Sequence, residues 1–171
     1  MLEVDLSDDY ANAKYISNAQ SFPEKWQKKA TNFRNERALF SNVELDIPYG
    51  PSDREKMDIF YPKKGTTGVF VFIHGGYWRA FDKSSWSHLS LAALDNGFVS
   101  VIPSYRLCPE VSIAQITLDI AKCIIAIANR VHSGPIVLAG HSAGGHLVSR
   151  MLCRNVLPEN VSTRLRRVVP I

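Results

Sequence analysis

Three short and almost uninterrupted apolar runs recur along the chain, at residues 69–73, 98–102 and 135–139. Runs of this kind are typical of strands that are buried on both faces of a parallel sheet. Segments of helical character separate them, most clearly over 113–131, where apolar side chains repeat along one stripe. The alternation predicts an α/β protein with a mostly parallel sheet and helices on both faces.

The chain ahead of the first apolar run has a different pattern. Residues 43–48 alternate weakly, as in a strand, and a turn at 49–53 separates them from a second expected strand at 57–61. The pair predicts an antiparallel hairpin before the parallel strands. Residues 8 to about 40 are polar and helical in character. We therefore expect a helical N-terminal arm over 1–40 and an α/β core over 41–171.

Two further helices and a last strand complete the expected order of elements. The pattern predicts one helix over about 84–96, which Gly97 ends, and a second over about 143–154. Residues 167–171 have the apolar character of one more strand.

Charge and composition narrow the possible partners. The 171 residues are 46% apolar and 21% charged, with a net charge of +4, as in an ordinary globular domain. The basic excess is spread out, apart from one group that we interpret as a solvated approach to the last strand: Arg164, Arg166 and Arg167. No basic stripe with interleaved aromatic residues occurs, so we expect no nucleic-acid partner.

The cysteines and the apolar runs indicate the compartment. Cys108, Cys123 and Cys153 are odd in number and widely spaced, so we expect free thiols in a reducing compartment. No apolar run approaches the ~18 residues of a membrane span, and the N-terminus lacks the apolar region of a signal peptide. We expect a cytoplasmic protein with no membrane partner.

Residues 140–144 read G-x-S-x-G between an expected buried strand and an expected helix. The motif requires this context, because its serine stands on a tight strand-to-helix turn that glycines on both sides make possible. The N-terminus of the following helix favours developing negative charge. We predict that Ser142 is a catalytic nucleophile; the alternative is a structural Gly/Ser turn.

A second glycine loop, His74-Gly75-Gly76-Tyr77-Trp78, follows the first buried strand. Glycines there allow main-chain N–H groups to face a reacting carbonyl. We predict that the N–H groups of Gly75, Gly76 and Ala143 form an oxyanion hole. The side chain of His74 is expected to be a structural hydrogen-bonding group rather than an acid or base.

Three motifs together resemble an α/β-hydrolase: HGGYW at 74–78, PSYRLCPE at 103–110 and GHSAGGHL at 140–147. The chain is similar, more narrowly, to the arylformamidase (kynurenine formamidase)-like esterases, whose mark is HGG-x-W, and DIPYG-P at 46–51 also looks like that group. The resemblance covers residues 10–171. It implies a serine hydrolase that cleaves carboxylic esters or aryl formamides through an acyl-enzyme on Ser142.

The resemblance also indicates which residues surround the nucleophile. Tyr77 stands where related hormone-sensitive-lipase-like esterases carry a third glycine, which favours the formamidase-like branch. Tyr77 and Trp78 are candidates to contact an aromatic substrate, or else they pack the loop. His141 is a candidate wall residue. The residues expected to form the scaffold of the site wall are Tyr105, Arg106 and Glu110.

One part of the family pattern is missing. The family's triad runs serine, acid, histidine along the chain, but after Ser142 there is no aspartate, one glutamate, Glu159, and one histidine, His146. His146 follows Ser142 by one helical turn, and we expect it to face the packed body, too far away to take the serine's proton. The chain is therefore expected to be truncated at its C-terminus, without its last strands and the triad acid and base.

Two other classes of protein are alternatives. The first is a hydrolase-fold scaffold that has lost catalytic competence, although Ser142 and the HGG loop are intact. The second is a metal enzyme using His74, His141 and His146, which lack any HxH or HExxH spacing. We expect no metal, no cofactor, a small-molecule ester or formamide as partner, and a possible homodimer.

Overall fold

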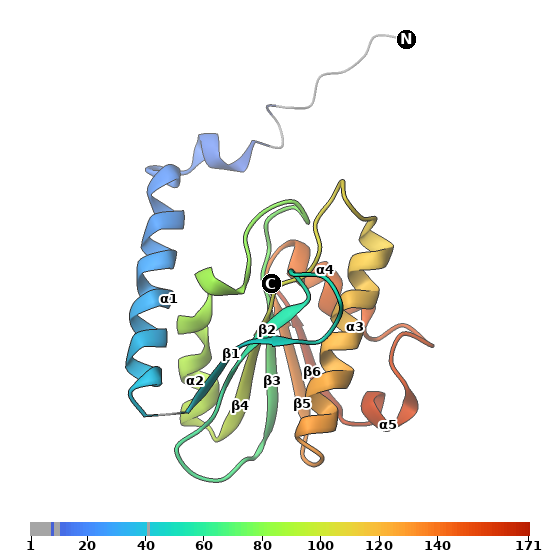
Figure 1. Cartoon of the computed structure of the whole chain (residues 1–171). Coiled ribbons are helices and arrows are strands. Elements are labelled where there is room, and N and C mark those ends of the chain that lie inside the picture. Colours follow the sequence, from blue (N-terminus) through green and yellow to red (C-terminus); the bar gives the residue numbers. More distant parts are fainter. Residues whose placement is uncertain (1–7, 9–10, 41) are drawn as a thin grey trace.

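Six strands form one sheet in the order β1-β2-β4-β3-β5-β6 in this computed structural model, which describes residues 8, 11–40 and 42–171 (Figure 1). The strands are β1 (Val43–Pro48), β2 (Lys56–Phe60), β3 (Gly68–Ile73), β4 (Phe98–Pro103), β5 (Ile136–Gly140) and β6 (Leu165–Pro170). Strands β4, β3, β5 and β6 are parallel, whereas β2 pairs antiparallel with both β1 and β4. The mostly parallel sheet and its antiparallel hairpin are confirmed.

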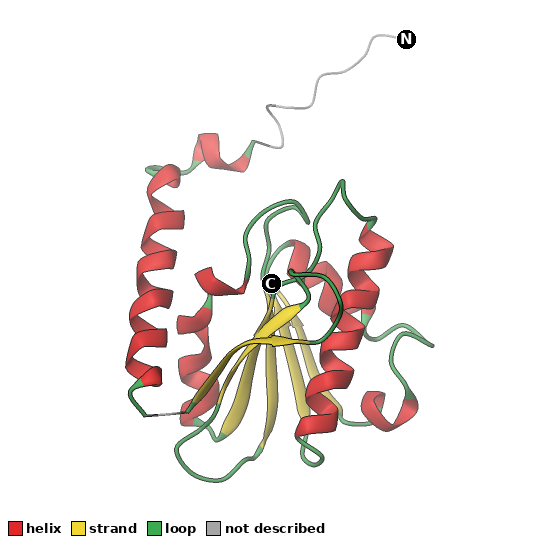
Figure 2. Ribbon diagram, viewed as in Figure 1, coloured by secondary structure: helices red, strands yellow, loops and turns green. Residues whose placement is uncertain are grey.

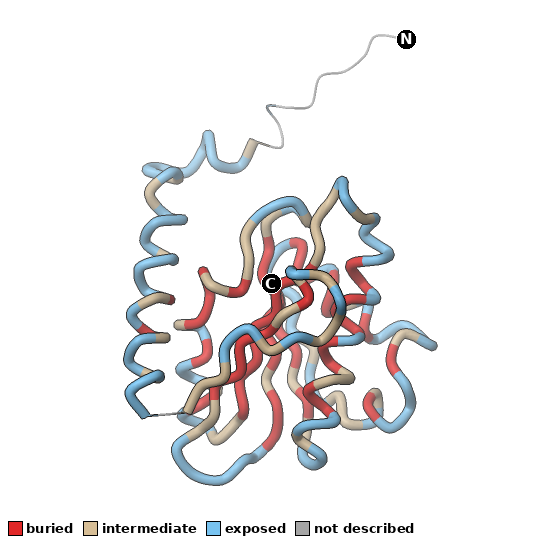
Figure 3. Tube along the Cα trace, in the orientation of Figure 1, coloured by how far each residue is buried: buried red, intermediate tan, exposed pale blue. Residues whose placement is uncertain are grey.

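Helices cover both faces of this sheet (Figure 2). One face carries α1 (Phe22–Ala38) and α2 (Leu91–Asp95), and the other carries α3 (Ile113–Arg130), α4 (Ala143–Arg150) and α5 (Glu159–Ser162). Two apolar clusters fill the space between helices and sheet. Buried residues accordingly concentrate in the strands and on the inward sides of the helices (Figure 3).

The packing of helix α3 explains why its sequence pattern predicted a helix so clearly. Its stripe residues Ile116, Ile120, Ile124 and Ile127 are fully buried against the sheet. Burying each such side chain stabilises the fold by roughly 1.5–3 kcal/mol. The helix begins with a capping box, in which the side chains of Ser112 and Gln115 each accept a hydrogen bond from the other's main-chain N–H.

The C-terminal end of α3 corrects our interpretation of Arg164. Its guanidinium is not merely solvated but donates hydrogen bonds to four main-chain carbonyls, those of Ala128, Val131, Ser133 and Gly134. These carbonyls lie where a helix leaves its acceptors without partners, so Arg164 caps α3. Arg166 and Arg167 are exposed, as expected.

Two helices are shorter than predicted. The segment expected as a helix over 84–96 is two 3₁₀ turns, Lys83–Ser85 and Ser87–Ser90, before α2 begins. Side chains there bond to the main chain instead, since Asp82 accepts from the Ser84 N–H and Ser104 accepts from the Lys83 N–H. The helix expected over 143–154 ends at Arg150, after which tighter turns continue the chain.

Helix α1, the main element of the described part of the N-terminal arm, lies along the α2 side of the molecule (Figure 1). Two 3₁₀ turns, Asn12–Tyr15 and Ala19–Ser21, lead into α1. The ring of Trp26 packs 4.9 Å from that of Trp86, and Phe33 packs edge-on against Phe60 at 5.3 Å. Residues 1–7, 9–10 and 41 lie outside the described residues, and so does the expected boundary between arm and core.

Candidate active site

The two glycine loops meet at the carboxyl end of the sheet. Strands β3 and β5 are parallel neighbours, and their register pairs Ile73 with Gly140. The two loops therefore leave the sheet at the same level. A Cβ atom added to Gly75 would lie 2.7 Å from the His141 carbonyl oxygen and 3.1 Å from the Ser142 Cβ. The absence of that atom lets the first loop approach the serine turn.

The serine turn has the strain expected of a nucleophile on a strand-to-helix turn. Ser142 is exposed and has φ 54° and ψ −118°, a conformation that L-residues rarely adopt. Its N–H donates to the Ile171 carbonyl at 2.7 Å. A Cβ atom on Gly144 would lie 2.0 Å from the Ile73 carbonyl oxygen, so a glycine is required where α4 crosses β3. Ala143, the first residue of α4, is buried.

The loop after β3 is equally unusual. Gly76, Tyr77 and Trp78 have φ angles of 112°, 54° and 55°, three positive values in succession. Two N–H groups, those of Arg79 and Ala80, donate to the Gly76 carbonyl and close the loop. Gly76 adopts its conformation without steric cost because it has no Cβ atom. For Tyr77 and Trp78 such conformations cost of order 1–3 kcal/mol each, and strain of this kind clusters at functional sites.

His74 behaves as a structural residue. It is fully buried, its Nδ1 lies 2.8 Å from the Gly75 carbonyl oxygen, and its ring stacks on that of Tyr105 at 4.3 Å. Burial lowers the pKa of His74 from 6.5 to about 4, so the imidazole is neutral at physiological pH. These contacts agree with the expectation that His74 holds the loop.

Tyr77 and Trp78 differ in their environments. Tyr77 is 58% exposed, and its hydroxyl accepts a hydrogen bond from the side-chain amide of Asn12 at 3.1 Å. Trp78 is half-buried and packs on the larger apolar cluster, while its carbonyl accepts from the Cys108 N–H at 2.7 Å. Asn12 had no signal in the sequence, because only the fold brings the arm to this loop.

His146 is placed differently from our prediction. It is exposed, and its ring lies edge-on to that of Trp78 at 5.4 Å. Residues four apart share a face of a helix. His146 follows Ser142 by four residues, so it lies on the same exposed face as the serine. Leu147 and Val148 instead are the residues of α4 that enter the core.

The residues expected to form the wall of the site include a partly buried ion pair. Tyr105 is fully buried, and Arg106 donates to both carboxylate oxygens of buried Asp119 at 2.6 and 2.8 Å. Asp119 was not predicted as a site residue; its signal in the sequence is a charged residue beside the apolar stripe of α3. Glu110, also expected in this scaffold, is exposed.

None of the chain's five histidines forms a hydrogen bond with the Ser142 hydroxyl in the described structure. His141 and His146 are exposed near the turn, and His74 is buried with its Nδ1 facing Gly75. Within the described residues, no three of the His, Cys, Asp and Glu side chains gather as metal ligands, and no helix has the length and apolarity needed to cross a membrane.

The fold and the site define the class of this protein. A sheet of this order, with a glycine loop after β3 and a strained serine turn after β5, is that of an α/β-hydrolase. Residues 57–163 match the family BD-FAE. The chain belongs to the BD-FAE family.

Individual relatives agree with this membership. Kynurenine formamidase from Drosophila melanogaster is 32% identical over 163 residues, which cover 88% of this chain and 54% of the relative. Kynurenine formamidase from Danio rerio is 26% identical over 125 residues, covering 71% of this chain and 43% of the relative. The similarity to arylformamidase-like esterases is thereby confirmed. The chain spans about half the length of these curated relatives.

A solved structure matches nearly all of this chain. The crystal structure of a Silicibacter sp. tm1040 protein, provisionally assigned as a thioesterase, is 52% identical with a TM-score of 0.94. The match covers 98% of this chain and 63% of that chain. Esterase B from Lactobacillus rhamnosis, at 20% identity and a TM-score of 0.59, shares the fold over 90% of this chain and 55% of its own.

Proposed function

We propose that this protein is a serine hydrolase that cleaves a carboxylic ester or an aryl formamide through an acyl-enzyme on Ser142. The observation that carries the proposal is the contact between the two loops. An exposed serine in a strained turn lies against Gly75, at the carboxyl end of neighbouring parallel strands. This combination supplies a nucleophile and main-chain donors to the same substrate carbonyl.

The reaction follows from these groups. The Ser142 oxygen bonds to the carbonyl carbon while a general base takes its proton. The negative charge that develops on the carbonyl oxygen is stabilised by the N–H groups of Gly75, Gly76 and Ala143. Each donor is worth roughly 3–4 kcal/mol in the transition state. The leaving alcohol or amine departs with the proton, and water then releases the acid from Ser142.

The general base and its acid come, in this proposal, from outside the 171 residues. The support is that no histidine of the described chain hydrogen-bonds the Ser142 hydroxyl, although all five are described. The second candidate function, a hydrolase-fold scaffold without catalytic competence, rests on the same observation. Activity decides between the two.

The substrate carries a planar aromatic group in this proposal. Exposed Tyr77 and half-buried Trp78 stand beside the predicted oxyanion donors, and exposed His141 adjoins the serine. Relatives named kynurenine formamidase favour an aryl formamide, whereas the Silicibacter protein favours a thioester. Three free cysteines, Cys108, Cys123 and Cys153, support a cytoplasmic location.

A substrate panel tests the proposal. N-formylkynurenine, short-chain aryl esters and short-chain aliphatic esters are compared on the protein purified from cells that make it, with its Ser142→Ala form as the control. We expect hydrolysis of the aryl substrates that the Ser142→Ala form lacks. Equal rates in both forms would overturn the nucleophile assignment, and no hydrolysis by either form would favour the scaffold.

A further inference from the structure

Arg54, in the turn between β1 and β2, reaches across to the loop that follows β3. Its Nε donates to the Tyr105 carbonyl oxygen at 2.8 Å, and its Nη2 donates to the Phe81 carbonyl oxygen at 2.5 Å. We propose that Arg54 is a positioning residue that holds the oxyanion loop, residues 74–81, in its reactive shape. The inference rests on the proposed function, because it assigns that loop the oxyanion donors.

The guanidinium of Arg54 contacts one end of the loop directly and is linked to the other end through Tyr105. Phe81 ends the loop and has φ 69°. Tyr105 holds the beginning of the loop, since its hydroxyl donates to the His74 carbonyl at 2.8 Å and its ring stacks on the imidazole. A planar, forked donor can bind the Phe81 and Tyr105 carbonyls at once, which a lysine ammonium cannot match in geometry.

The loop needs such an external support. Four of its residues, Gly76, Tyr77, Trp78 and Phe81, have positive φ angles, and only the first is a glycine. Conformations of this kind persist where surrounding contacts determine them, because local preference alone favours other backbone states. The hydrogen bonds from Arg54 are charge-assisted and therefore stronger than those between neutral groups.

The charge of Arg54 is directed to these carbonyls. Among the described residues it forms no ion pair, unlike the nearby Lys83, which pairs with Asp46 and Asp58 at 2.8 and 2.7 Å. Asp82 lies close enough to the Arg54 guanidinium for its pKa to be affected. Burial opposes ionisation of Asp82, but hydrogen bonds from Ser84 and the charge of Arg54 outweigh burial and hold its pKa below the ordinary value.

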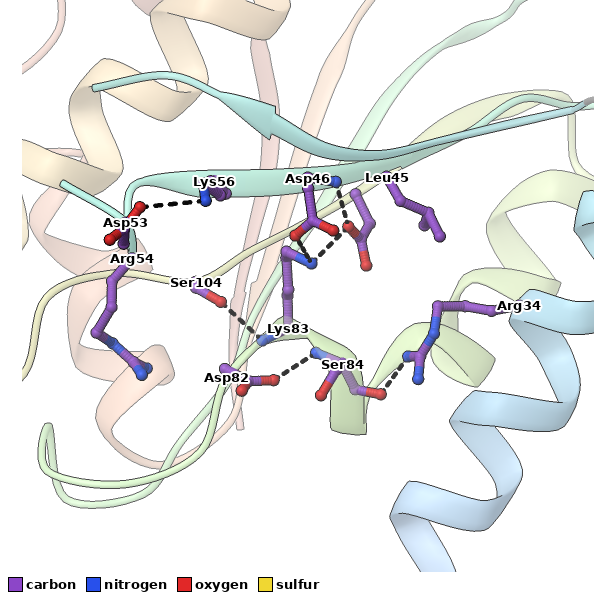
Figure 4. Close-up of a pocket in the computed structure, with 11 residues that line it drawn as sticks. Arg34, Leu45, Asp46, Asp53, Arg54, Lys56, Asp82, Lys83, Ser84 and Ser104 are labelled. Carbon is purple, nitrogen blue, oxygen red and sulfur yellow. Dashed lines mark hydrogen bonds and ion pairs between the residues drawn. The ribbon is translucent and has the colours of Figure 1, made fainter. Parts of the chain in front are cut away.

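A polar cavity of about 350 Å³ gives access to Arg54 from solvent (Figure 4). Arg54 and Arg34 stand at opposite ends of its lining, with Asp82, Lys83 and Ser84 between them. Arg34 donates to the Ser84 carbonyl and to the Ser87 hydroxyl, outside residues 74–81. Arg34 is therefore a matched control: the same side chain in the same cavity, without contact to the oxyanion loop.

The main experiment follows the loop directly, without turnover. Amide resonances of Gly75 and Gly76 are measured by ¹⁵N NMR in the isotope-labelled protein purified from cells that make it, and in its Arg54→Ala, Arg54→Lys and Arg34→Ala forms. We expect the two glycine resonances to shift or broaden in both Arg54 variants and to stay unchanged in Arg34→Ala. Unchanged glycine resonances in the Arg54 variants would overturn the proposal, and Arg54→Lys keeps the test available if Arg54→Ala does not fold.

Chemical rescue separates positioning from general stability. Guanidinium ion at millimolar concentration, far below the molar range that unfolds proteins, can enter the cavity that Arg54→Ala enlarges. We expect it to restore the Gly75 and Gly76 resonances, and methylammonium to restore them less. If the two ions act equally, the forked geometry of Arg54 has no role and the proposal fails.

Activity then distinguishes this proposal from the proposed function. In the protein purified from cells that make it, Arg54→Ala should lower kcat about tenfold to hundredfold with a smaller change in KM, since a misplaced donor acts mainly in the transition state. If the Gly75 and Gly76 resonances move in the Arg54 variants but the unaltered protein hydrolyses no substrate, the proposed function is wrong and the positioning role stands. Normal kcat in Arg54→Ala would contradict the positioning role alone.

Discussion

The Tyr105 hydroxyl donates to the His74 main-chain carbonyl at 2.8 Å, and the two rings stack 4.3 Å apart at 12°. This pair fixes the point where the chain leaves β3 and enters the glycine loop. It also excludes water from the imidazole, which is fully buried. The stability of the loop is thereby tied to the uncharged state of His74.

A pH dependence of stability follows from this burial. The pKa of His74 is lowered from 6.5 to about 4, so between these values the unfolded chain binds a proton that the folded chain does not. The free energy of unfolding should therefore fall as the pH drops from 6.5 to 4, by roughly 3 kcal/mol for this residue. Urea unfolding across a pH series measures the slope.

His74→Gln serves as the comparison for that series, because glutamine has no proton to bind in this range. Its unfolding free energy should vary less with pH between 6.5 and 4 than that of the unaltered chain. Identical slopes, or an imidazole resonance of His74 that titrates near 6.5, would show that the residue is not buried as described.

The glycines after Ser142 should differ sharply in their tolerance of alanine. At Gly144 a Cβ atom would lie 2.0 Å from the Ile73 carbonyl oxygen, whereas at Gly145 its nearest neighbours are 3.2 Å away. We expect Gly144→Ala to lower the free energy of unfolding by roughly 3 kcal/mol. Gly145→Ala should stay within about 1 kcal/mol, since alanine's helix propensity offsets its tight fit.

Chemical denaturation of the two variants makes this comparison. Because both glycines lie in the same helix, each variant controls for the other's effect on helix formation. A similar loss of stability at Gly144 and Gly145 would mean that α4 does not cross β3 as closely as the structure places it.

Much of the fold was predictable, for a physical reason. Strands buried on both faces and the α3 stripe are set by burial, and burial leaves a periodic pattern in the sequence. The segment over 84–96 was mispredicted because its serines and Asp82 bond to the main chain locally, which apolar periodicity does not reveal. His146 was mispredicted because its exposure depends on which face of α4 meets the sheet.

The residues of the candidate site also fall into those that the sequence predicted and those that only the fold brings together. Short motifs identify Ser142, Gly75 and Gly76, since tight turns need particular residues at fixed spacing. Arg54 and Asn12 carry no such signal. Each acts on the loop from a distant part of the chain, so their roles appear only when the hairpin turn and the arm are placed in space.

Arg164 should contribute measurably to stability through the end of α3. Arg164→Ala leaves four main-chain carbonyls without this donor, and we expect a loss of roughly 2 kcal/mol in the free energy of unfolding. Exposed Arg166→Ala removes the same charge from the same strand region and should change stability by less than about 0.5 kcal/mol. Equal effects would assign the loss to net charge, against the capping role.

Tyr77 should influence the choice of substrate without affecting the fold. It is 58% exposed, so Tyr77→Ala should leave the melting temperature unchanged. Loss of ring stacking, worth about 0.5–1.5 kcal/mol, should lower kcat/KM for aryl esters by up to about tenfold and spare aliphatic esters. Half-buried Trp78 packs on the core, so Trp78→Ala should also lower the melting temperature. Equal losses of kcat/KM for aryl and aliphatic esters would show that Tyr77 does not contact the aromatic group of the substrate.

The most direct test of the central claim is to find where an acyl group attaches. The 171-residue chain and its Ser142→Ala variant are treated with p-nitrophenyl acetate, with and without added imidazole as an external base, and the peptides are mapped by mass spectrometry. An oxyanion hole alone retains part of the catalysis when triad members are absent. We predict acetylation at Ser142 that imidazole accelerates. Acetylation confined to other residues, or an identical pattern in Ser142→Ala, would contradict the account.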